Sequence, residues 1–378
     1  MLTNVPRIAH HAPSRRWSAR TGAVLAGAAL LGIVGAGPAL AAGGGSGSGG
    51  GDQFVQRNLI SDIPGMASIT DPNLVNPWGL AAGPTSPLWV ADNGADVSTV
   101  YTGAVNGSRP SIAPLVVRIP GGAPTGVVFN PTRAFVVHGA KKSAPATFIF
   151  DSEAGRVTAW SAGVPPSTSA RTVVNAHGAI FKGLAMASVP RHGPLLYATD
   201  FHNNRIDVYN GRFNPVRLSG SFTDRSLPAG YAPFNIQALG GSLYVTYAKQ
   251  DANAEDDVAG AGFGFVDVYS PNGHLMKRLV SRGNLNAPWG LVVAPSGFGR
   301  FGGDLLVGNF GDGTVNAYNP RTGAFQGQLR TADGKAFQVD GLWGLRFGNG
   351  TFGTSQDLVF SAGINDESHG LLGTISTR

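Results

Sequence analysis

The chain has 378 residues, a formal net charge of +6 and no cysteine, which excludes disulfides, lipid attachment through cysteine and thiolate metal sites. Residues 1–41 contain four arginines and no acid, so the rest of the chain has a net charge of only +2 and no basic excess to support a nucleic-acid partner. The 56 glycines and 25 prolines suit a fold with many tight turns.

Residues 1–41 have the features of a secretory signal peptide. Arg15, Arg16 and Arg20 precede an apolar stretch rich in Gly and Ala, and the small residues of Ala39-Leu40-Ala41 follow it. The arginine pair suits the twin-arginine route, but the hydrophobic pair expected after it is missing, so twin-arginine and Sec export both stay open. We expect an exported protein, periplasmic or extracellular.

The sequence also predicts how the mature chain is organised. The apolar stretch is short for a membrane span, so we expect no transmembrane domain after signal cleavage. Residues 42–53 form a flexible Gly/Ser-rich linker, and residues 54–378 form the folded domain.

Six repeats fill this domain, and each begins with an apolar strand after a bend. The second residue of each strand serves as a marker, and the six markers, called the marker ring below, are Trp78, Thr125, Lys182, Phe234, Trp289 and Trp343. They are spaced 47, 57, 52, 55 and 54 residues apart. A period near 50 with strands in every repeat predicts an all-β fold, a six-bladed β-propeller in one domain.

The later strands of each repeat predict how the propeller closes. Five repeats continue to a third strand that ends in an aromatic residue, but the sixth repeat ends at Arg378 without a fourth strand. The fourth strands of the other five are predicted at Leu115–Ile119, Arg171–Val174, Val216–Ser219, Met276–Val280 and Phe325–Leu329. The isolated strand from Phe54 to Ile60 belongs to no other repeat and could supply the strand that repeat six lacks. We therefore expect the N-terminal strand to close the last blade, which would remove an open sheet edge.

The marker ring is the first candidate binding site, since its residues should cluster at one mouth of the central channel. Four aromatic rings, a hydroxyl and an ammonium could bind a sugar ring or a cation, or the aromatic rings could simply plug the channel. Asn235 stands where the other five repeats have glycine, and we expect it to supply a left-handed backbone conformation there.

Two loops add polar candidates. The blade-four insertion concentrates Asp251, Glu255, Asp256 and Asp257 in seven residues, which suggests either a calcium site or a solvated acidic loop. The equivalent loop of blade six supplies Asn365, Asp366, Glu367 and His369, of which the histidine could act as a base or a ligand, or the loop could be an ordinary polar turn. Both loops interrupt the same strand pair, so they should project from the same face.

Polar residues also recur where second strands end. Asp92, Asp151, Asp200 and Asn309 occupy this place, and their recurrence favours a role in holding the following turn. The second strand of blade two could end at Asp151 or at His138.

Several motifs carry a family resemblance. The strings at Leu88–Asn93 and Tyr197–Ile206 resemble NHL-type repeats, and NPWGLA at Asn76, LVGNFGDGTVNAYNP at Leu306 and INDESHGLLG at Ile364 resemble an uncharacterised family of exported bacterial propellers. That resemblance implies fold and export but no activity. A wider resemblance to calcium-dependent phosphotriesterase and gluconolactonase propellers implies a channel-mouth metal held by Glu, Asn and Asp, of which this chain matches only Asn235.

The expected function is therefore a binding or interaction module, with its site at the channel mouth and the blade-four and blade-six loops. A small molecule, a glycan or an envelope protein is the expected partner of a monomeric propeller. The alternative is a metal-dependent hydrolase of lactone or phosphoester type, for which calcium would be the cofactor.

Overall fold

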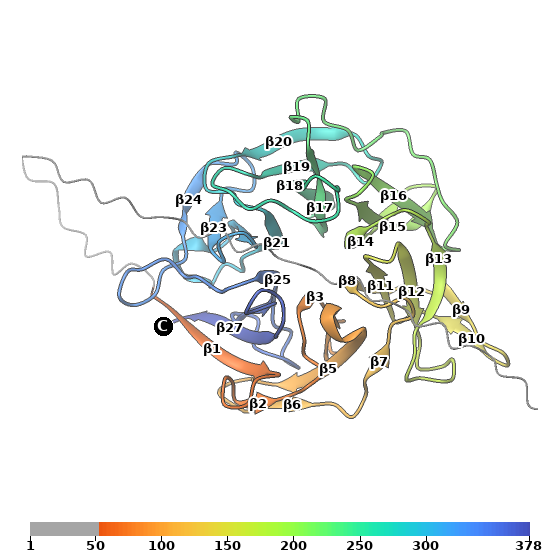
Figure 1. Ribbon diagram of the computed structural model, residues 1–378, viewed down its shortest axis with the longest axis horizontal. Helices are drawn as coiled ribbons and strands as arrows, with labels where there is room; N and C mark the ends of the chain where they lie inside the picture. Colours follow the sequence, from red (N-terminus) through yellow and green to blue (C-terminus); the bar gives the residue numbers. More distant parts are fainter. Residues whose placement is uncertain (1–52) are drawn as a thin grey trace, which may run out of the picture. The chain divides into compact units, whose positions relative to one another are not determined.

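A computed structural model describes residues 53–378, so the predicted signal peptide and nearly all of the linker lie outside the described residues. The described part forms six small antiparallel sheets in a ring around a central channel (Figure 1). The innermost strand of each sheet contacts the innermost strands of both neighbouring sheets, so the ring is closed. The prediction of an all-β, six-bladed propeller is confirmed.

Each blade runs from an inner strand outward in chain order. Blades one to three consist of β3 (Pro77–Ala81), β4 (Leu88–Asp92), β5 (Val97–Gly103), β6 (Pro110–Ile112) and β7 (Val117–Arg118); β8 (Pro124–Phe129), β11 (Phe148–Ser152), β12 (Arg156–Trp160) and β13 (Arg171–Asn175); and β14 (Phe181–Val189), β15 (Gly193–Asp200) and β16 (Arg205–Asn210).

The remaining blades follow the same order. Blades four to six consist of β17 (Tyr231–Leu239), β18 (Ser242–Lys249), β19 (Phe265–Tyr269) and β20 (Leu275–Ser281); β21 (Pro288–Val293), β22 (Leu305–Asn309), β23 (Val315–Tyr318) and β24 (Phe325–Gln328); and β25 (Leu342–Phe347), β26 (Leu358–Ala362), β27 (Leu371–Thr377), β1 (Phe54–Ser61) and β2 (Ile69–Thr70). The apolar core lies mainly between neighbouring blades, where facing strands bury their side chains against each other.

The N-terminal strand closes blade six, as predicted. β1 pairs antiparallel with β27 in a register that sets Phe54 opposite Thr377 and Ser61 opposite Leu371. Phe54 is 2% exposed and packs against Phe298 and Phe301 of blade five. The two ends of the described chain are therefore joined by a ladder of backbone hydrogen bonds, and the outer edge of β27 is paired with β1.

Two predicted outer strands differ in the structure, and a proline directly precedes each of them. In blade three, Val216–Ser219 does not form a strand; Val216 N bonds Val208 O, and beside it Pro215 makes only an isolated bridge to Tyr209. In blade one, the strand predicted at 115–119 is shortened to β7, and β6 is an additional outer strand on the other side of Pro114. Proline lacks the N–H that a continuous ladder needs.

Blade two contains an extra hairpin. Its second strand is β11, which includes Asp151, while His138 ends β9 (Val136–His138) in a separate two-stranded sheet with β10 (Ser143–Pro145). Asp151 is therefore the residue equivalent to Asp92 and Asp200, and the choice left open by the sequence is settled.

These polar strand-end residues do hold nearby backbone. Asp92 Oδ2 accepts a bond from Thr99 N at 2.8 Å, and Asp151 Oδ1 accepts bonds from Thr125 Oγ1 at 2.9 Å and Gly126 N at 2.6 Å. Burial raises the pKa of Asp151 to about 7 and that of Asp92 well above its usual range, against the effect of these hydrogen bonds. Asp200 holds the turn that follows it, since its Oδ1 accepts Asn203 N at 3.2 Å, whereas Asp151 holds the inner strand of its own blade.

The glycine that follows the marker in five inner strands permits close packing between blades. A Cβ on Gly79 would lie 2.5 Å from Thr125 O, and one on Gly183 would lie 2.3 Å from Asn235 Oδ1. Neither these glycines nor Asn235 has a positive φ. The expectation that Asn235 replaces a left-handed glycine is therefore wrong, because the constraint is space and not backbone conformation.

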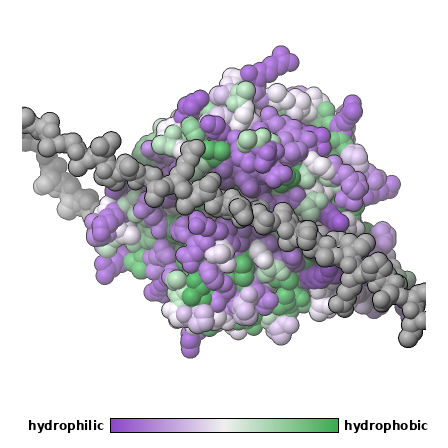
Figure 2. Space-filling model, in the orientation of Figure 1, coloured by the Kyte–Doolittle hydropathy of each residue, from purple (hydrophilic) through white to green (hydrophobic). Residues whose placement is uncertain are grey.

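Hydrophilic and hydrophobic residues are interspersed over the part of the surface that Figure 2 shows. The helical elements of residues 53–378 are two single turns, η1 (Asn93–Ala95) and η2 (Gly299–Phe301), and neither could cross a membrane.

Candidate functional site

The aromatic residues of the marker ring fill one end of the channel. Trp78 and Trp343 stack with their ring centroids 3.5 Å apart, and Trp289 meets both edge-on at 6.0 and 5.8 Å. Phe234 and Phe310 complete the group, and Phe310 stacks on Trp343 at 3.9 Å. The four marker aromatics are 0–4% exposed, so their faces contact one another and the structure supports the plug interpretation. This end is called the plugged end below.

Lys182 lies in the plugged end with all its contacts made inside the protein. Its Nζ donates to Glu153 Oε1 at 2.6 Å and to Asp256 Oδ1 at 3.2 Å, and it stands 5.4 Å from the centroid of the Trp78 ring. Burial lowers the pKa of Lys182, but the two carboxylates outweigh it and raise that pKa above its ordinary value. The ammonium therefore keeps its proton, and its positive charge is already balanced by the two carboxylates.

Polar side chains extend this pairing around the channel. Asn93 Nδ2 donates to Glu153 Oε2 at 3.0 Å, and Asn76 Nδ2 donates to Asn93 Oδ1 at 3.3 Å and to Glu367 Oε2 at 2.7 Å. Trp343 Nε1 donates to Asn76 Oδ1 at 3.2 Å, and Trp289 Nε1 donates to Lys182 O at 2.9 Å. Side chains from all six blades are thus connected at this end.

The blade-four and blade-six loops meet at the plugged end, since Asp256 reaches Lys182 and Glu367 reaches Asn76. Burial raises the pKa of Asp257 to about 7 despite nearby Lys182, and burial also raises the pKa of Glu367. Within residues 53–378, no group of three or more His, Asp or Glu side chains is placed to hold a metal ion.

The other loop candidates serve the loops themselves. Asp251 Oδ1 accepts the backbone N–H groups of Asn253 and Glu255 at 3.2 and 2.9 Å, while the Glu255 side chain is exposed. Asn365 and Asp366 are exposed, and together with Glu367 they have positive φ values of 55°, 52° and 62°, a strained conformation for three successive residues with side chains.

His369 pairs with a residue that the sequence analysis did not single out. Its Nδ1 lies 2.6 Å from Asp62 Oδ2, and the other Asp62 oxygen accepts Gly370 N at 2.8 Å. Asp62 directly follows β1, 307 residues earlier, so only the closure of the propeller brings the two together.

Thr125, the remaining member of the marker ring, is fully buried. Its hydroxyl donates to Asp151 Oδ1 and to Phe181 O, both at 2.9 Å. It therefore links blades two and three and presents no group to a ligand.

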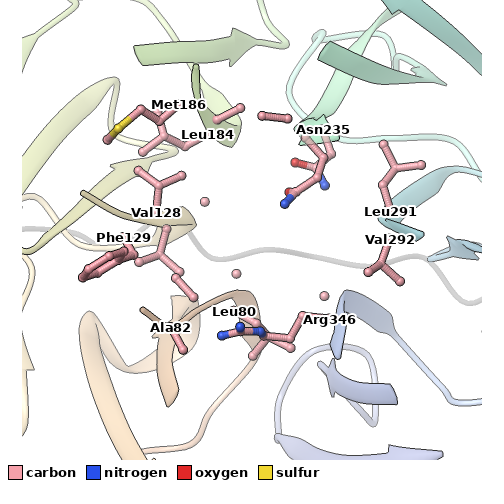
Figure 3. A pocket seen from close by; sticks show the side chains of 18 of the residues that line it. Leu80, Ala82, Val128, Phe129, Leu184, Met186, Asn235, Leu291, Val292 and Arg346 are labelled. Atoms are coloured by element: carbon pink, nitrogen blue, oxygen red, sulfur yellow. The ribbon is translucent and has the colours of Figure 1, made fainter. Parts of the chain in front are cut away.

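The channel contains a pocket of about 540 Å³ lined by all six inner strands. The residue three positions after each marker contributes to its wall, and these six residues, called the pocket ring, are Ala81, Val128, Ala185, Gln237, Val292 and Arg346. Leu80, Leu184, Met186 and Leu291 add apolar surface (Figure 3). Trp289 lines the pocket and belongs to the plug, so the plug bounds the pocket on one side. This end is called the pocket end.

Asn235 also lines the pocket. Its Nδ2 donates to Trp289 O at 2.7 Å and its Oδ1 accepts Ile236 N at 2.7 Å, so the amide is fixed by backbone groups of blades four and five. Of the sequence candidates, Asn235 and Trp289 belong to the pocket lining, and the others do not.

Arg346 is the charged residue of the pocket. It reaches from β25 toward Leu80, across the pocket from Asn235 (Figure 3). Its Nη1 is buried and has no hydrogen-bond partner among the described residues. Burial lowers the pKa of Arg346 to about 10, so the guanidinium keeps its charge at neutral pH.

The sequence contained a signal for Arg346 that the motif analysis missed. When the six inner strands are aligned, the positions equivalent to Arg346 hold Ala, Val or Gln. Arg346 is therefore the charged residue at a repeat position that is otherwise uncharged.

Comparisons with known proteins give relatives but no activity. No protein-family model matches the chain. Uncharacterized protein R648 of Acanthamoeba polyphaga mimivirus is 33% identical over 325 residues, covering 84% of this chain and 78% of that protein. Uncharacterized protein L690 of the same virus is 31% identical over 329 residues, covering 84% of each. These relatives are viral, so they do not support the expected bacterial, NHL-type family.

Among solved structures, a virginiamycin B lyase from Staphylococcus aureus has a TM-score of 0.49 and 12% identity, covering 86% of this chain and 99% of that one. A gluconolactonase-type structure has a TM-score of 0.40 and 18% identity, covering 68% and 88%. Scores at this level lend no support to any activity of the chain.

Proposed function

The chain belongs to the family that includes the mimivirus proteins R648 and L690, and from its own geometry we propose that it is a binding module whose channel pocket holds a small molecule. The observation that carries this proposal is the pocket of about 540 Å³ bounded by the plug. Pockets of about 300–1,000 Å³ with apolar walls and a few polar groups are typical small-molecule sites.

The pocket is also rigidly held. Each wall segment belongs to an inner strand, and each inner strand packs against the next with a glycine at the closest approach in five blades. A site built on strands keeps its shape before a ligand arrives, so binding requires little ordering of the protein.

The plugged end is the weaker candidate. Its aromatic faces contact each other, and Lys182 is already paired with two carboxylates. A ligand there would have to displace these contacts, whereas a ligand in the pocket would cover surface that faces the cavity.

A ligand screen with a blocking variant tests the proposal. Quenching of Trp fluorescence, to which pocket-lining Trp289 contributes, is measured across small molecules and glycans for the wild type, for Val292→Phe and for Val293→Phe. Val292 lines the pocket, while its neighbour Val293 is 37% exposed and lies outside the lining. We expect Val292→Phe to abolish binding and Val293→Phe to retain it.

The other outcomes are also informative. Val128→Phe, three blades away on the pocket wall, should repeat the loss if Val292→Phe proves unstable. Failure of the whole panel to bind, or equal binding by both valine variants, would refute the proposal. Turnover of lactones or phosphoesters with calcium, lost in Val292→Phe, would replace the binding module by the hydrolase.

A further inference from the structure

Arg346 gives the pocket a specific charge. It is the one charged residue among the described residues that line the cavity, and no Asp or Glu belongs to that lining. The second polar member of the pocket ring, Gln237, has an exposed amide on blade four. The pocket therefore combines a single positive charge with walls of mixed polar and apolar surface.

Other arginines of the propeller show what is unusual about Arg346. Arg278 pairs with Asp267 at 2.9 Å and also with Asp224, and Arg205 pairs with Asp207 at 2.7 Å and Asp200 at 3.1 Å. For Arg346 no ion pair is formed within residues 53–378, and its Nη1 is both buried and unbonded. A partly buried charge without a partner costs free energy that an anion in the pocket would recover.

The shape of the guanidinium and the number of charges in the pocket lining limit which anions fit the pocket. A guanidinium presents parallel N–H groups that match a planar carboxylate, and such charge-assisted pairs are among the stronger hydrogen bonds. With one cation in the lining, a monoanion is balanced, whereas a phosphate dianion would leave a surplus negative charge without a second cation to pair with. The half-buried side chains of Val128, Met186 and Val292 line the pocket and offer apolar surface to the rest of such a ligand.

Resting on the proposed function, we infer that the ligand of the channel pocket is a small carboxylate with an apolar body. Its carboxylate pairs with the guanidinium of Arg346, and its body lies against the apolar side chains of the neighbouring blades. The inference adds a ligand class to the pocket and assigns Arg346 as the residue that selects it.

Eight-carbon probes that differ only in their head group test this inference. Octanoate, octanol, octylamine and octyl phosphate are titrated into the purified wild-type chain, with Trp quenching and calorimetry as readouts. We expect octanoate to bind at least about tenfold more tightly than octanol, and octylamine more weakly than either, since a hydrogen bond to a charged group is worth about tenfold or more.

Arg346→Gln removes the charge while retaining a polar side chain. We expect it to weaken octanoate binding by about tenfold or more and to leave octanol binding unchanged. Arg212→Gln, at an exposed position on blade three, makes the same change in net charge away from the pocket and should change neither affinity. Melting curves of both variants check that the fold is intact.

The failures can be told apart. If octanol binds as tightly as octanoate, or if Arg346→Gln leaves octanoate binding intact, the carboxylate inference falls and the pocket remains a binding site. Tighter binding of octyl phosphate would overturn the choice of head group. If octanoate binds equally to Val292→Phe, the assignment to the pocket is wrong, and if nothing in either panel binds, the proposed function falls with the inference.

Discussion

Within residues 53–378, Lys182 lies at one end of the channel and Arg346 at the other, and the two cations have opposite surroundings. Lys182 at the plugged end is 2% exposed and is paired with Glu153 and Asp256 above stacked tryptophans. Arg346 at the pocket end faces a cavity and has no carboxylate beside it. The first arrangement connects the blades, while the second leaves a charge to be satisfied from outside the chain.

The largest expected effect is on the aromatic plug. Trp343→Ala removes the stacking on Trp78 and on Phe310 and leaves a cavity where the blades meet, so we expect a loss of about 3–5 kcal/mol in the free energy of unfolding. Val292→Ala, whose side chain already faces the cavity, should cost about 1 kcal/mol or less. Guanidinium unfolding measures both, and equal losses would contradict the distinction between the ends.

Removal of the paired cation should come next. Lys182→Met leaves the carboxylates of Glu153 and Asp256 without their counter-charge, which we expect to cost about 3 kcal/mol at pH 8. An unchanged stability at pH 8 would show that the network around the plug does not hold the blades together.

The pH dependence of stability separates buried from exposed acids. Burial raises the pKa of Asp151 to about 7, so the folded state holds a proton that the unfolded state has lost, and this stabilisation, present below about pH 4, fades as the pH rises through 7. The same sign applies to Asp257, at about 7, and to Asp267, at about 6. We expect the melting temperature to fall by several degrees between pH 5 and pH 8.

Asp151→Asn should remove part of this slope. Asp333→Asn is the control, because this exposed residue has a pKa lowered to about 2 by its hydrogen bond to Thr331 and by Lys335, and so does not titrate between pH 5 and pH 8. A slope that Asp151→Asn leaves unchanged would mean that other groups control the pH dependence.

The smallest effect on stability is expected for the unpaired cation. Arg346→Met removes a partly desolvated charge without orphaning a partner, so the free energy of unfolding should change by less than about 1 kcal/mol. Octanoate should raise the melting temperature of the wild type, because it binds only the folded state, and should not raise that of the variant. A large loss of stability in Arg346→Met without ligand would show that this arginine is structural, like Lys182.

The repeats predicted the architecture because each blade is a local unit. The inner strands, the aromatic ends of the third strands and the missing outer strand of blade six were enough to predict a propeller closed by β1. Local chemistry also limited the prediction. The outer strands that follow Pro114 and Pro215 were predicted longer than they are, since β7 covers only two residues and Pro215 makes only an isolated bridge.

The site was predicted less well, since the type of a residue does not reveal which residues it contacts in the folded protein. The marker ring was placed correctly at one end of the channel, but whether its aromatic faces were free depended on the 3.5 Å stacking of Trp78 on Trp343. The blade-six loop was expected to supply a histidine with nearby acids, yet the partner of His369 is Asp62. Arg346 stood out in the aligned repeats only once its position in the pocket was known.

By itself, the sequence determined the number of blades and the closure of the ring, since both follow from the repeat. Only the tertiary structure decided which end is plugged and which charge lacks a partner. The physical reason is that pairing depends on atoms brought together by closure of the ring, such as Asn76 and Glu367, which are 291 residues apart in the chain.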